Sequence, residues 1–240
     1  MHFLTHSGVR VPAVTAEQMR RVDELATGEF GLNLLQMVEN AGWALASVVL
    51  RLREATPGSV LVLAGRGGNG GGGLCVVRHL RNRGVRVEVV LAFPPRDLSD
   101  AARLQFEVLQ RDGLKPVDAK RVWAFSGTGL VVDALIGYNL SGAPERRVAE
   151  LTSLANAFDG PVVSLDVPSG VDATTGQAFD PVVVPTHTVT LGLPKTGLRE
   201  QPGLLYLADI GMPQRVFERI ALSYHWPDET QWVLELISAE

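Results

Sequence analysis

The chain has 240 residues, of which 46% are hydrophobic and 20% charged, so it contains enough apolar material for a large core. Its formal net charge of −4 argues against a nucleic acid or an anionic membrane held by bulk charge. The single cysteine, Cys75, excludes an intramolecular disulfide framework and a cysteine-clustered zinc site. The first residues lack the apolar run of a signal peptide, and no apolar stretch approaches the roughly 20 residues that span a bilayer. We therefore expect a soluble, cytoplasmic protein with no membrane partner.

Two helices are predicted before the first strand. Residues Thr15 to Gln18 read T-A-E-Q, the capping-box pattern in which a hydroxyl and a Gln three residues later satisfy free backbone donors at a helix start. Apolar residues then recur at helical spacing, and a second helical pattern runs from about residue 32 to residue 53. Pro57-Gly58 ends this N-terminal helical region.

After Pro57-Gly58, short apolar runs alternate with helical segments. The run SVLVLA at 59–64 is continuously apolar and rich in β-branched residues, as expected of a strand buried on both faces. Further strands are predicted at 85–93, 130–135, 161–167, 186–191 and 204–210, and helices at 74–83, 98–110 and 145–158. This alternation predicts an α/β fold with a mostly parallel sheet covered by helices on both faces.

We expect a single domain over residues 1–240, with a core of about 14–213. Residues 214–240 form a C-terminal extension in this interpretation, a helix followed by a docked or trailing tail. Ligands of such folds bind beyond the carboxyl ends of the strands. Three segments are predicted to meet there although they are far apart in sequence: 65–73, 133–142 and 166–172.

The first of these segments is a glycine loop, G-R-G-G-N-G-G-G-G, from Gly65 to Gly73. Glycines there allow positive φ angles and a close approach of a ligand to the backbone, and the following helix start suits a phosphate. An ordinary Rossmann dehydrogenase is disfavoured because the second strand ends without an acid for the ribose, and the absence of Gly-Lys-Ser/Thr excludes a P-loop. A tight turn without a ligand is the alternative.

The other two segments each place an acid at a strand end. Asp133 interrupts the apolar run V-V-D-A-L, so it must be paired, hydrogen-bonded, metal-bound or functional. It is a candidate general acid or base or a cation ligand, or an acceptor of loop N–H groups. In S-L-D-V-P-S-G-V-D, Asp166 is a candidate ligand of ribose or amide groups, and Ser169 of a monovalent ion; a plain turn is the alternative.

Other reactive side chains give weaker signals. The five histidines show no metal-ligand spacing, so we interpret them as structural or exposed. Lys195 either reaches a phosphate or is a solvated loop lysine, and Cys75 is interpreted as a small core residue.

Taken in order, several segments resemble the YjeF N-terminal domain family, the NAD(P)H-hydrate epimerases. The glycine loop with Asn69-Gly70-Gly71 stands where the family has G-x-G-N-N-G-G-D-G. The other segments that carry the resemblance are Val14–Arg20 with Asp23, Phe30–Gly42, Val132–Gly142, Leu165–Asp172, Thr188–Lys195 and Asp209–Pro213. The resemblance therefore covers nearly the whole chain.

The resemblance implies a three-layer α/β/α Rossmann-like sandwich and an enzyme that interconverts the R and S forms of hydrated NADH or NADPH (NADHX and NADPHX). It also implies a bound potassium ion and a homodimer. In some relatives a dehydratase domain is fused to this one, so here we expect the NAD(P)HX dehydratase to be a separate partner enzyme.

Site residues are implied by position. Asn69, Asp133 and Ser169 are the implied potassium ligands, and Asp133 is also the implied catalytic residue. The implied substrate-binding residues are Gly68, Asn69, Gly70, Gly71, Gly72, Gly137, Tyr138, Asn139, Leu140, Ser141, Gly142, Ala143 and Asp166.

This chain departs from the family pattern at two loop positions, because Gly68 and Gly72 replace the first Asn and the Asp of N-N-G-G-D. A lost charged contact to a ligand costs about 1.5–3 kcal/mol. The alternative hypothesis is therefore a catalytically degenerate member that binds a nucleotide ligand or a protein partner as a scaffold.

Overall fold

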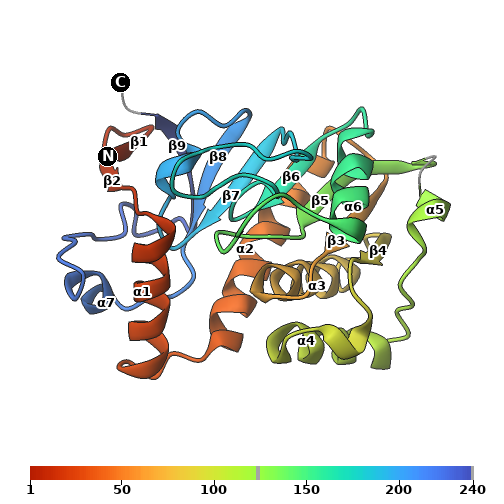
Figure 1. Ribbon diagram of the computed structural model, residues 1–240, viewed down its shortest axis with the longest axis horizontal. Helices are drawn as coiled ribbons and strands as arrows, with labels where there is room; N and C mark the ends of the chain where they lie inside the picture. Colours follow the sequence, from red (N-terminus) through yellow and green to blue (C-terminus); the bar gives the residue numbers. More distant parts are fainter. Residues whose placement is uncertain (123–124, 239–240) are drawn as a thin grey trace.

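Short apolar runs assemble into one mostly parallel sheet in the computed structural model, which describes residues 1–122 and 125–238 (Figure 1). Within those residues nine strands are ordered β2-β1-β9-β8-β7-β6-β5-β3-β4. The strands are β1 (His2–Thr5), β2 (Arg10–Pro12), β3 (Ser59–Ala64), β4 (Val87–Leu91), β5 (Thr128–Ala134), β6 (Val162–Leu165), β7 (His187–Leu191), β8 (Leu204–Ala208) and β9 (Val233–Ser238). Strands β3 to β8 pair in parallel, as the sequence predicts.

Helices cover both faces of the sheet, so the predicted α/β sandwich is confirmed (Figure 1). The helices are α1 (Ala16–Gly28), α2 (Leu34–Arg53), α3 (Gly68–Arg81), α4 (Asp100–Arg111), α5 (Ala119–Val122), α6 (Arg146–Asn156) and α7 (Gln214–Glu218). Alternate residues of β3 point to opposite cores: Val60 and Val62 pack with α2, α3 and α4, while Leu61 and Leu63 pack with α5 and α6. None of these helices, in the part of the chain described, is both long and apolar enough to cross a membrane.

Side-chain caps fix the starts of the first two helices. The Thr15 hydroxyl accepts the Gln18 N–H at 3.1 Å, and the Gln18 side chain accepts the Thr15 N–H at 2.9 Å. This confirms the predicted capping box. Asn33 and Gln36 form the same reciprocal arrangement at the start of α2. Each cap satisfies two backbone donors that would otherwise lack a partner.

Helix α3 begins six residues earlier than the sequence predicts, at Gly68 rather than Leu74. The glycines therefore form its first turns instead of a loop, and none of the glycines from 65 to 73 has a positive φ. Two of these positions require glycine because the backbone there approaches another backbone segment closely. A Cβ on Gly65 would lie 1.9 Å from the Leu135 carbonyl oxygen, and one on Gly70 would lie 1.9 Å from the Gly65 carbonyl oxygen.

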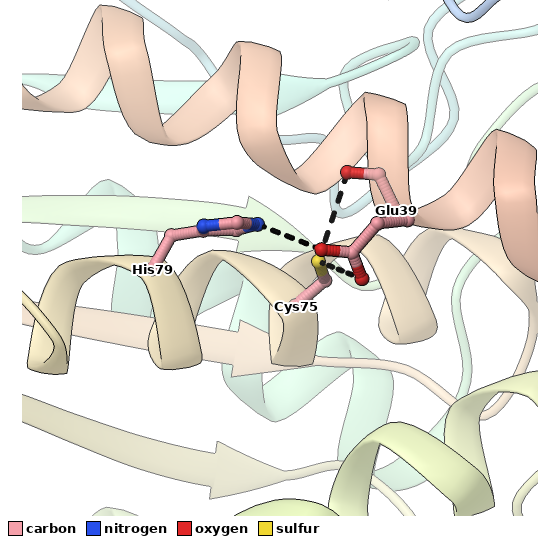
Figure 2. A group of neighbouring side chains, drawn as sticks. All are labelled: Glu39, Cys75 and His79. Atoms are coloured by element: carbon pink, nitrogen blue, oxygen red, sulfur yellow. Dashed lines mark hydrogen bonds and ion pairs between the residues drawn. The ribbon is translucent and has the colours of Figure 1, made fainter.

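Helices α2 and α3 pack closely and share a polar cluster at their interface (Figure 2). A Cβ on Gly42 would lie 2.4 Å from the Cys75 Cβ, so the contact needs glycine. Beside it, Cys75 Sγ donates to Glu39 Oε2 at 3.3 Å, and His79 Nε2 lies 3.0 Å from Glu39 Oε1. Arg78 completes the cluster with an ion pair to Glu39.

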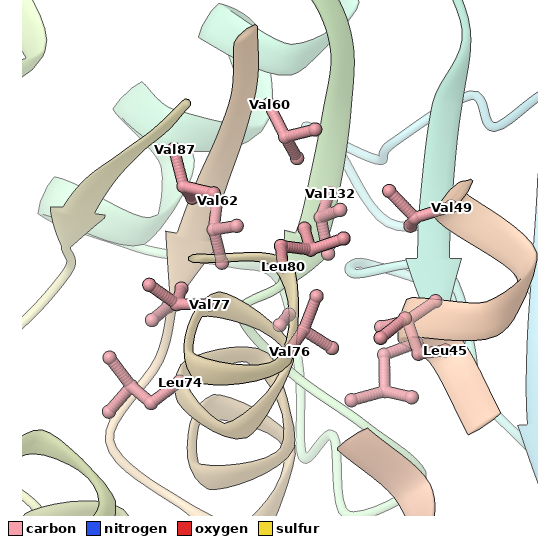
Figure 3. Close-up of a cluster of buried hydrophobic side chains, with 14 of the residues drawn as sticks. Leu45, Val49, Val60, Val62, Leu74, Val76, Val77, Leu80, Val87 and Val132 are labelled. Atoms are coloured by element: carbon pink, nitrogen blue, oxygen red, sulfur yellow. The ribbon is translucent and has the colours of Figure 1, made fainter. Parts of the chain in front are cut away.

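The larger apolar core lies between β3, β4, β5 and helices α2, α3 and α4 (Figure 3). Branched side chains such as Val62, Val132 and Leu80 interdigitate there and are fully buried. Complete burial of one such side chain contributes about 1.5–3 kcal/mol. This core holds the carboxyl ends of the central strands in fixed register.

The chain termini add an antiparallel edge that the sequence analysis did not predict. Strands β1 and β2 form a hairpin, and β9 pairs with β1 on one side and with β8 on the other. The expected C-terminal helix is the short α7, and the expected docked or trailing tail is strand β9; residues 239–240 of that segment lie outside the described residues. The alternating burial of β9 explains why no continuous apolar run marks it.

Candidate functional site

A pocket of about 1060 Å³ lies along the carboxyl ends of the parallel strands. Its lining draws on the segments that follow six strands in order along the sheet, β4, β3, β5, β6, β7 and β8. Strand order reverses between β3 and β5, because β4 flanks β3 on one side while the later strands continue on the other. Ligands of doubly wound folds bind at such a switch point.

The start of α3 opens into this pocket through Gly67, Gly68 and Asn69. Among the described residues no side chain caps this helix, so its first backbone N–H groups face the pocket with the positive end of the helix dipole. Arg66 and Arg146 add positive charge to the lining, with Arg66 stacked on Phe93 at 5.2 Å from the ring centroid. This part of the pocket is suited to a phosphate-bearing ligand.

A buried ion pair lies at the end of β6. Lys195 Nζ contacts Asp166 Oδ1 at 2.5 Å, and both side chains are almost fully buried. Lys195 also donates to the Leu191 carbonyl oxygen at 2.9 Å, while Asp166 accepts the Tyr138 N–H at 3.0 Å. Asp166 has φ +69°, a left-handed conformation that non-glycine residues rarely adopt. Lys195 is therefore not the solvated loop lysine that was one of the two expectations.

Tyr138 connects the ion pair to a second carboxyl group in the pocket wall. Its hydroxyl donates a short hydrogen bond to Asp23 of α1, and its ring lies 5.7 Å from Lys195 Nζ. Burial raises the pKa of Asp23 above its ordinary value, against the lowering effects of the Tyr138 hydrogen bond and the Lys195 charge. Burial, together with the negative charge of Asp23, also raises the pKa of Tyr138.

Asp133 lies beneath the pocket rather than in its lining, fully buried on β5. Its two carboxylate oxygens accept four hydrogen bonds, from the Ser164 hydroxyl, the Ser169 N–H, the Ser169 hydroxyl and the Leu135 N–H, at 2.6–3.2 Å. Burial raises the pKa of Asp133, and these hydrogen bonds oppose that rise. Asp133 and Ser169 thus form one buried unit under the loop after β5.

The structure separates the predicted site residues into two groups. Those that line the pocket are Gly68, Asn69, Gly137, Tyr138, Asn139, Leu140, Ser141, Gly142, Ala143 and Asp166. Those that lie beneath it are Gly70, Gly71, Gly72, Asp133 and Ser169, all buried. Asn69 belongs to the lining, and its amide donates to the Leu165 carbonyl oxygen at 3.1 Å.

Sequence reasoning assigned no site role to Asp23, whose carboxyl group faces the pocket. A signal for it exists, because Asp23 follows the buried Met19 by four residues and so lies on the same inward face of α1. Nothing local marks the pairing of Lys195 with Asp166, because the two residues are brought together only by the parallel register of β6 and β7.

A metal ion could be held by three or more His, Cys, Asp or Glu side chains whose ligand atoms lie close together. In the described chain the one such group is the cluster of Glu39, Cys75 and His79, whose ligand atoms all lie within 4.8 Å of one another (Figure 2). Arg78 Nη2 contacts both Glu39 carboxylate oxygens at 2.5 Å and Cys75 Sγ at 3.5 Å, so the guanidinium group already neutralises the Glu39 carboxylate that a metal ion would need. Burial raises the pKa of the Cys75 thiol, which keeps it protonated. We interpret the cluster as a link between α2 and α3.

Comparisons with known proteins agree with this geometry. Residues 34–197 match the family model described as YjeF-related protein N-terminus. The chain is 44% identical to an NAD(P)H-hydrate epimerase of Dehalogenimonas lykanthroporepellens, over 100% of this chain and 99% of that protein. It is 35% identical to a bifunctional NAD(P)H-hydrate repair enzyme of Moorella thermoacetica over 89% of this chain, but only 44% of that enzyme's length.

Among solved structures, the crystal structure of yeast ynu0 (YNL200c) superposes with a TM-score of 0.79 at 25% identity. The match covers 94% of this chain and 100% of the yeast chain. The family-model match spans more than half of the sequence, and a full-length relative is well above 30% identical. The chain therefore belongs to the family of YjeF-related protein N-termini.

Proposed function

We propose that this chain is an NAD(P)H-hydrate epimerase, which interconverts the R and S epimers of hydrated NADH and NADPH in nicotinamide nucleotide repair. One observation carries the proposal: the strand-end segments Gly67–Asn69, 135–148 and Leu165-Asp166 line a single pocket that also contains titratable side chains. The 44% identity to an NAD(P)H-hydrate epimerase along the whole chain supports it.

The dimensions of the pocket suit a dinucleotide. Six neighbouring strand ends at about 4.8 Å spacing span roughly 24 Å, room for two nucleosides joined by a pyrophosphate. The N-terminus of α3, with Arg66 and Arg146, offers positive charge for the phosphates. Met19, Met37 and Ile210 supply an apolar wall beside Asp23 for the neutral hydrated ring.

Epimerisation at a hydrated ring carbon requires that a hydroxyl be lost and regained, or that the ring open and close. Either route moves a proton to and from oxygen, and a positioned side chain accelerates such a step by about 10²–10⁴-fold. Asp166 and Asp23 both line the pocket and both accept hydrogen bonds from Tyr138, so such a proton transfer is possible beside Tyr138. We therefore orient the hydrated ring toward these two carboxyl groups.

The family also implies potassium, and the donor atoms present fit such an ion. The Asn69 carbonyl, the Asp133 carboxylate and the Ser169 hydroxyl offer oxygen atoms only, the ligand type that hard cations prefer. The Asn69 amide donates to Leu165, which turns its carbonyl oxygen toward Gly137. Bound there, the ion would add positive charge beneath the substrate; Asp133 and Ser169 would hold it and also support the loop after β5.

The remaining expectations complete the proposal. We propose that the protein acts in the cytoplasm as a homodimer. We also propose that it supplies the S epimer to an NAD(P)HX dehydratase, a coupling suggested by relatives named as bifunctional repair enzymes. We propose that Asp133 supports the substrate loop, because its carboxylate lies below the pocket with four internal hydrogen bonds. Its proposed role as a potassium ligand rests on the family pattern.

The test is a coupled assay on mixed R- and S-NADHX in potassium buffer. An S-specific dehydratase with its nucleotide removes the S form, and the slow loss of the R form is followed with and without this protein. We expect consumption of R well above the spontaneous rate. Background consumption by the wild-type protein would refute the proposal and favour the scaffold hypothesis.

A pair of glycine variants assigns the activity to the pocket. A Cβ on Gly137 would lie 3.0 Å from Asp166 Oδ2 and 3.2 Å from Asn69 Oδ1, so Gly137→Val should abolish the activity by narrowing the pocket. Gly28 ends α1, and no atom in the described part of the chain lies within 4 Å of an added Cβ there. Gly28→Val is therefore the matched control and should remain active.

A further inference from the structure

Asp23 is the pocket carboxyl group that the structure leaves available for chemistry; this inference rests on the proposed epimerase function. Its Oδ2 accepts the Tyr138 hydroxyl, and within the described chain its Oδ1 accepts no hydrogen bond from the protein. Helix α1 turns the side chain into the pocket beside Met19. One carboxylate oxygen is thus held in place while the other remains free for a ligand.

The other carboxyl groups are less suitable. Asp166 is neutralised by Lys195 at 2.5 Å and also accepts the Tyr138 N–H. Glu145 is exposed to solvent at the pocket rim. Asp133 lies below the pocket, where all its contacts are internal.

The surroundings of Asp23 suit a proton donor. Three ionisable groups face it from other elements: Tyr138 from the loop after β5, Lys195 from the segment after β7 and Asp166 from the end of β6. Burial raises the pKa of Asp23, the Tyr138 hydrogen bond and the Lys195 charge lower it, and the Asp166 charge raises it again. The net rise makes the protonated form more accessible than for an exposed aspartic acid.

We propose that Asp23 is the catalytic residue that donates and recovers the proton during epimerisation, and that Tyr138 is its positioning residue. The Asp23 proton passes to the hydroxyl oxygen on the hydrated carbon, the C–O bond breaks, and water leaves. The lone pair of the adjacent ring nitrogen forms the C=N bond that replaces it. Water then adds to the opposite face of that carbon, the C=N electron pair returns to nitrogen, and the Asp23 carboxylate takes the released proton.

Tyr138 has a defined part in this arrangement. Its hydroxyl holds Oδ2 of Asp23, which directs Oδ1 to the substrate, and its ring packs over Lys195. Removal of the hydroxyl should raise the pKa of Asp23, because that hydrogen bond lowers it. Phenylalanine at position 138 keeps the ring and the backbone N–H that Asp166 accepts.

The experiment measures kcat, KM and the pH profile of the coupled R-NADHX assay for Asp23→Asn and Tyr138→Phe. We expect Asp23→Asn to lower kcat by about 10²–10⁴-fold with KM changed by less than about threefold. The wild-type rate should fall as the pH rises through the pKa of Asp23, because the acid form starts the reaction. Tyr138→Phe should shift this alkaline limb to higher pH, which a purely structural role would not do.

Glu24→Gln is the matched control, because Glu24 is the exposed neighbour of Asp23 on α1 and pairs with Arg21. It should leave kcat and the pH profile unchanged. An Asp23→Asn variant that keeps more than about a tenth of the wild-type kcat would overturn the proposal. If Asp23→Asn fails to fold, an unshifted limb in Tyr138→Phe overturns it instead; an inactive wild type refutes the epimerase function itself.

Discussion

Gly72 shows at the scale of one residue how this chain accommodates its departure from the family glycine motif. A Cβ at this position would lie 2.7 Å from Leu165 Cδ2, so the Leu165 side chain fills the space that an aspartate would need. At Gly68, by contrast, no atom of the described residues lies within 4 Å of an added Cβ. Packing against Leu165 therefore explains the glycine at position 72, whereas the space around Gly68 would accept a side chain.

This difference predicts unequal costs for restoring the family residues. Gly72→Asp should lower the free energy of unfolding by about 1–3 kcal/mol through overpacking, whereas Gly68→Asn should change it by no more than about 0.5 kcal/mol. Leu165→Ala should cost less in the Gly72→Asp background than in the wild type, because it relieves the contact at 2.7 Å. Urea denaturation of the wild type, the three single variants and the Gly72→Asp/Leu165→Ala double variant checks this, and equal costs at positions 68 and 72 would contradict it.

The buried ion pair between Lys195 and Asp166 also predicts how single substitutions change the free energy of unfolding. Loss of one partner of a buried pair leaves an uncompensated charge, so Lys195→Met should lower the free energy of unfolding by about 3–5 kcal/mol. Asp166→Asn added to Lys195→Met should recover a substantial part, since asparagine is neutral and tolerates the left-handed φ of +69°. A double-mutant cycle by chemical denaturation measures the coupling. Additive losses would show that the pair does not act as a unit.

At the scale of elements, α2 and α3 are joined by Glu39, and this contact has a predictable pH dependence. Burial raises the pKa of Glu39, but the hydrogen bonds from Arg78 and Cys75 and the charges of Arg78 and His79 outweigh it and lower that pKa below its ordinary value of 4.5. Stability from the carboxylate is therefore present above about pH 4.5 and is lost as the pH falls through the lowered pKa.

We expect Glu39→Gln to lower the free energy of unfolding by about 1 kcal/mol at pH 7, since the pair is partly exposed and screened by solvent. The difference from wild type should shrink at pH 4. Urea unfolding at the two pH values checks this. Glu24→Gln, which removes a mostly exposed pair with Arg21, should cost less than about 0.5 kcal/mol at either pH. A Glu39→Gln loss that is the same at both pH values would contradict the argument.

Helices and strands could be predicted from the sequence where a short local pattern is enough to specify them. The capping box at Thr15 and the continuous apolar run at 59–64 each specify a helix start or a buried strand without help from distant residues. The start of α3 was not predictable, because glycine disfavours helix and the close approaches that require glycine here, such as that of Gly70 to the Gly65 backbone, arise only in the assembled fold. Strand β9 was missed because its pairing with β1 joins opposite ends of the chain.

Some residues of the candidate site were likewise predictable from local sequence, and others were not. Asp133 and Asp166 are marked by acids at the ends of apolar runs, so sequence places them at the correct edge of the sheet. The sequence does not indicate how far each acid lies from the pocket surface. Asp166 lines the pocket, whereas Asp133 lies below it, where the Ser164 and Ser169 hydroxyls donate hydrogen bonds to its carboxylate. Asp23 belongs to a helix more than 100 residues away, and only the assembled fold brings it to Tyr138.

At the scale of the whole molecule, residues at the ends of six strands line the pocket, so a ligand bound there contacts and stabilises most of the sheet. Anything that binds the folded state alone raises its stability by linkage. If Asn69, Asp133 and Ser169 hold potassium as proposed, KCl should stabilise the protein more than choline chloride at equal ionic strength. At ten times the dissociation constant the gain is about 1.4 kcal/mol, or roughly 3–5 °C in Tm for a chain of this size.

Thermal unfolding in the two salts, for wild type and two serine variants, tests this prediction. Ser169→Ala should lose the potassium-specific increment, because it removes one proposed ligand, and should also lower Tm in both salts, because Asp133 loses a hydrogen bond of 2.6 Å. Ser153→Ala changes an exposed serine of α6 whose hydroxyl donates to the Ala149 carbonyl oxygen of the same helix, and it should keep the increment. An equal Tm in KCl and choline chloride for wild type would contradict a potassium site in this protein. An increment that survives in Ser169→Ala would place the ion elsewhere.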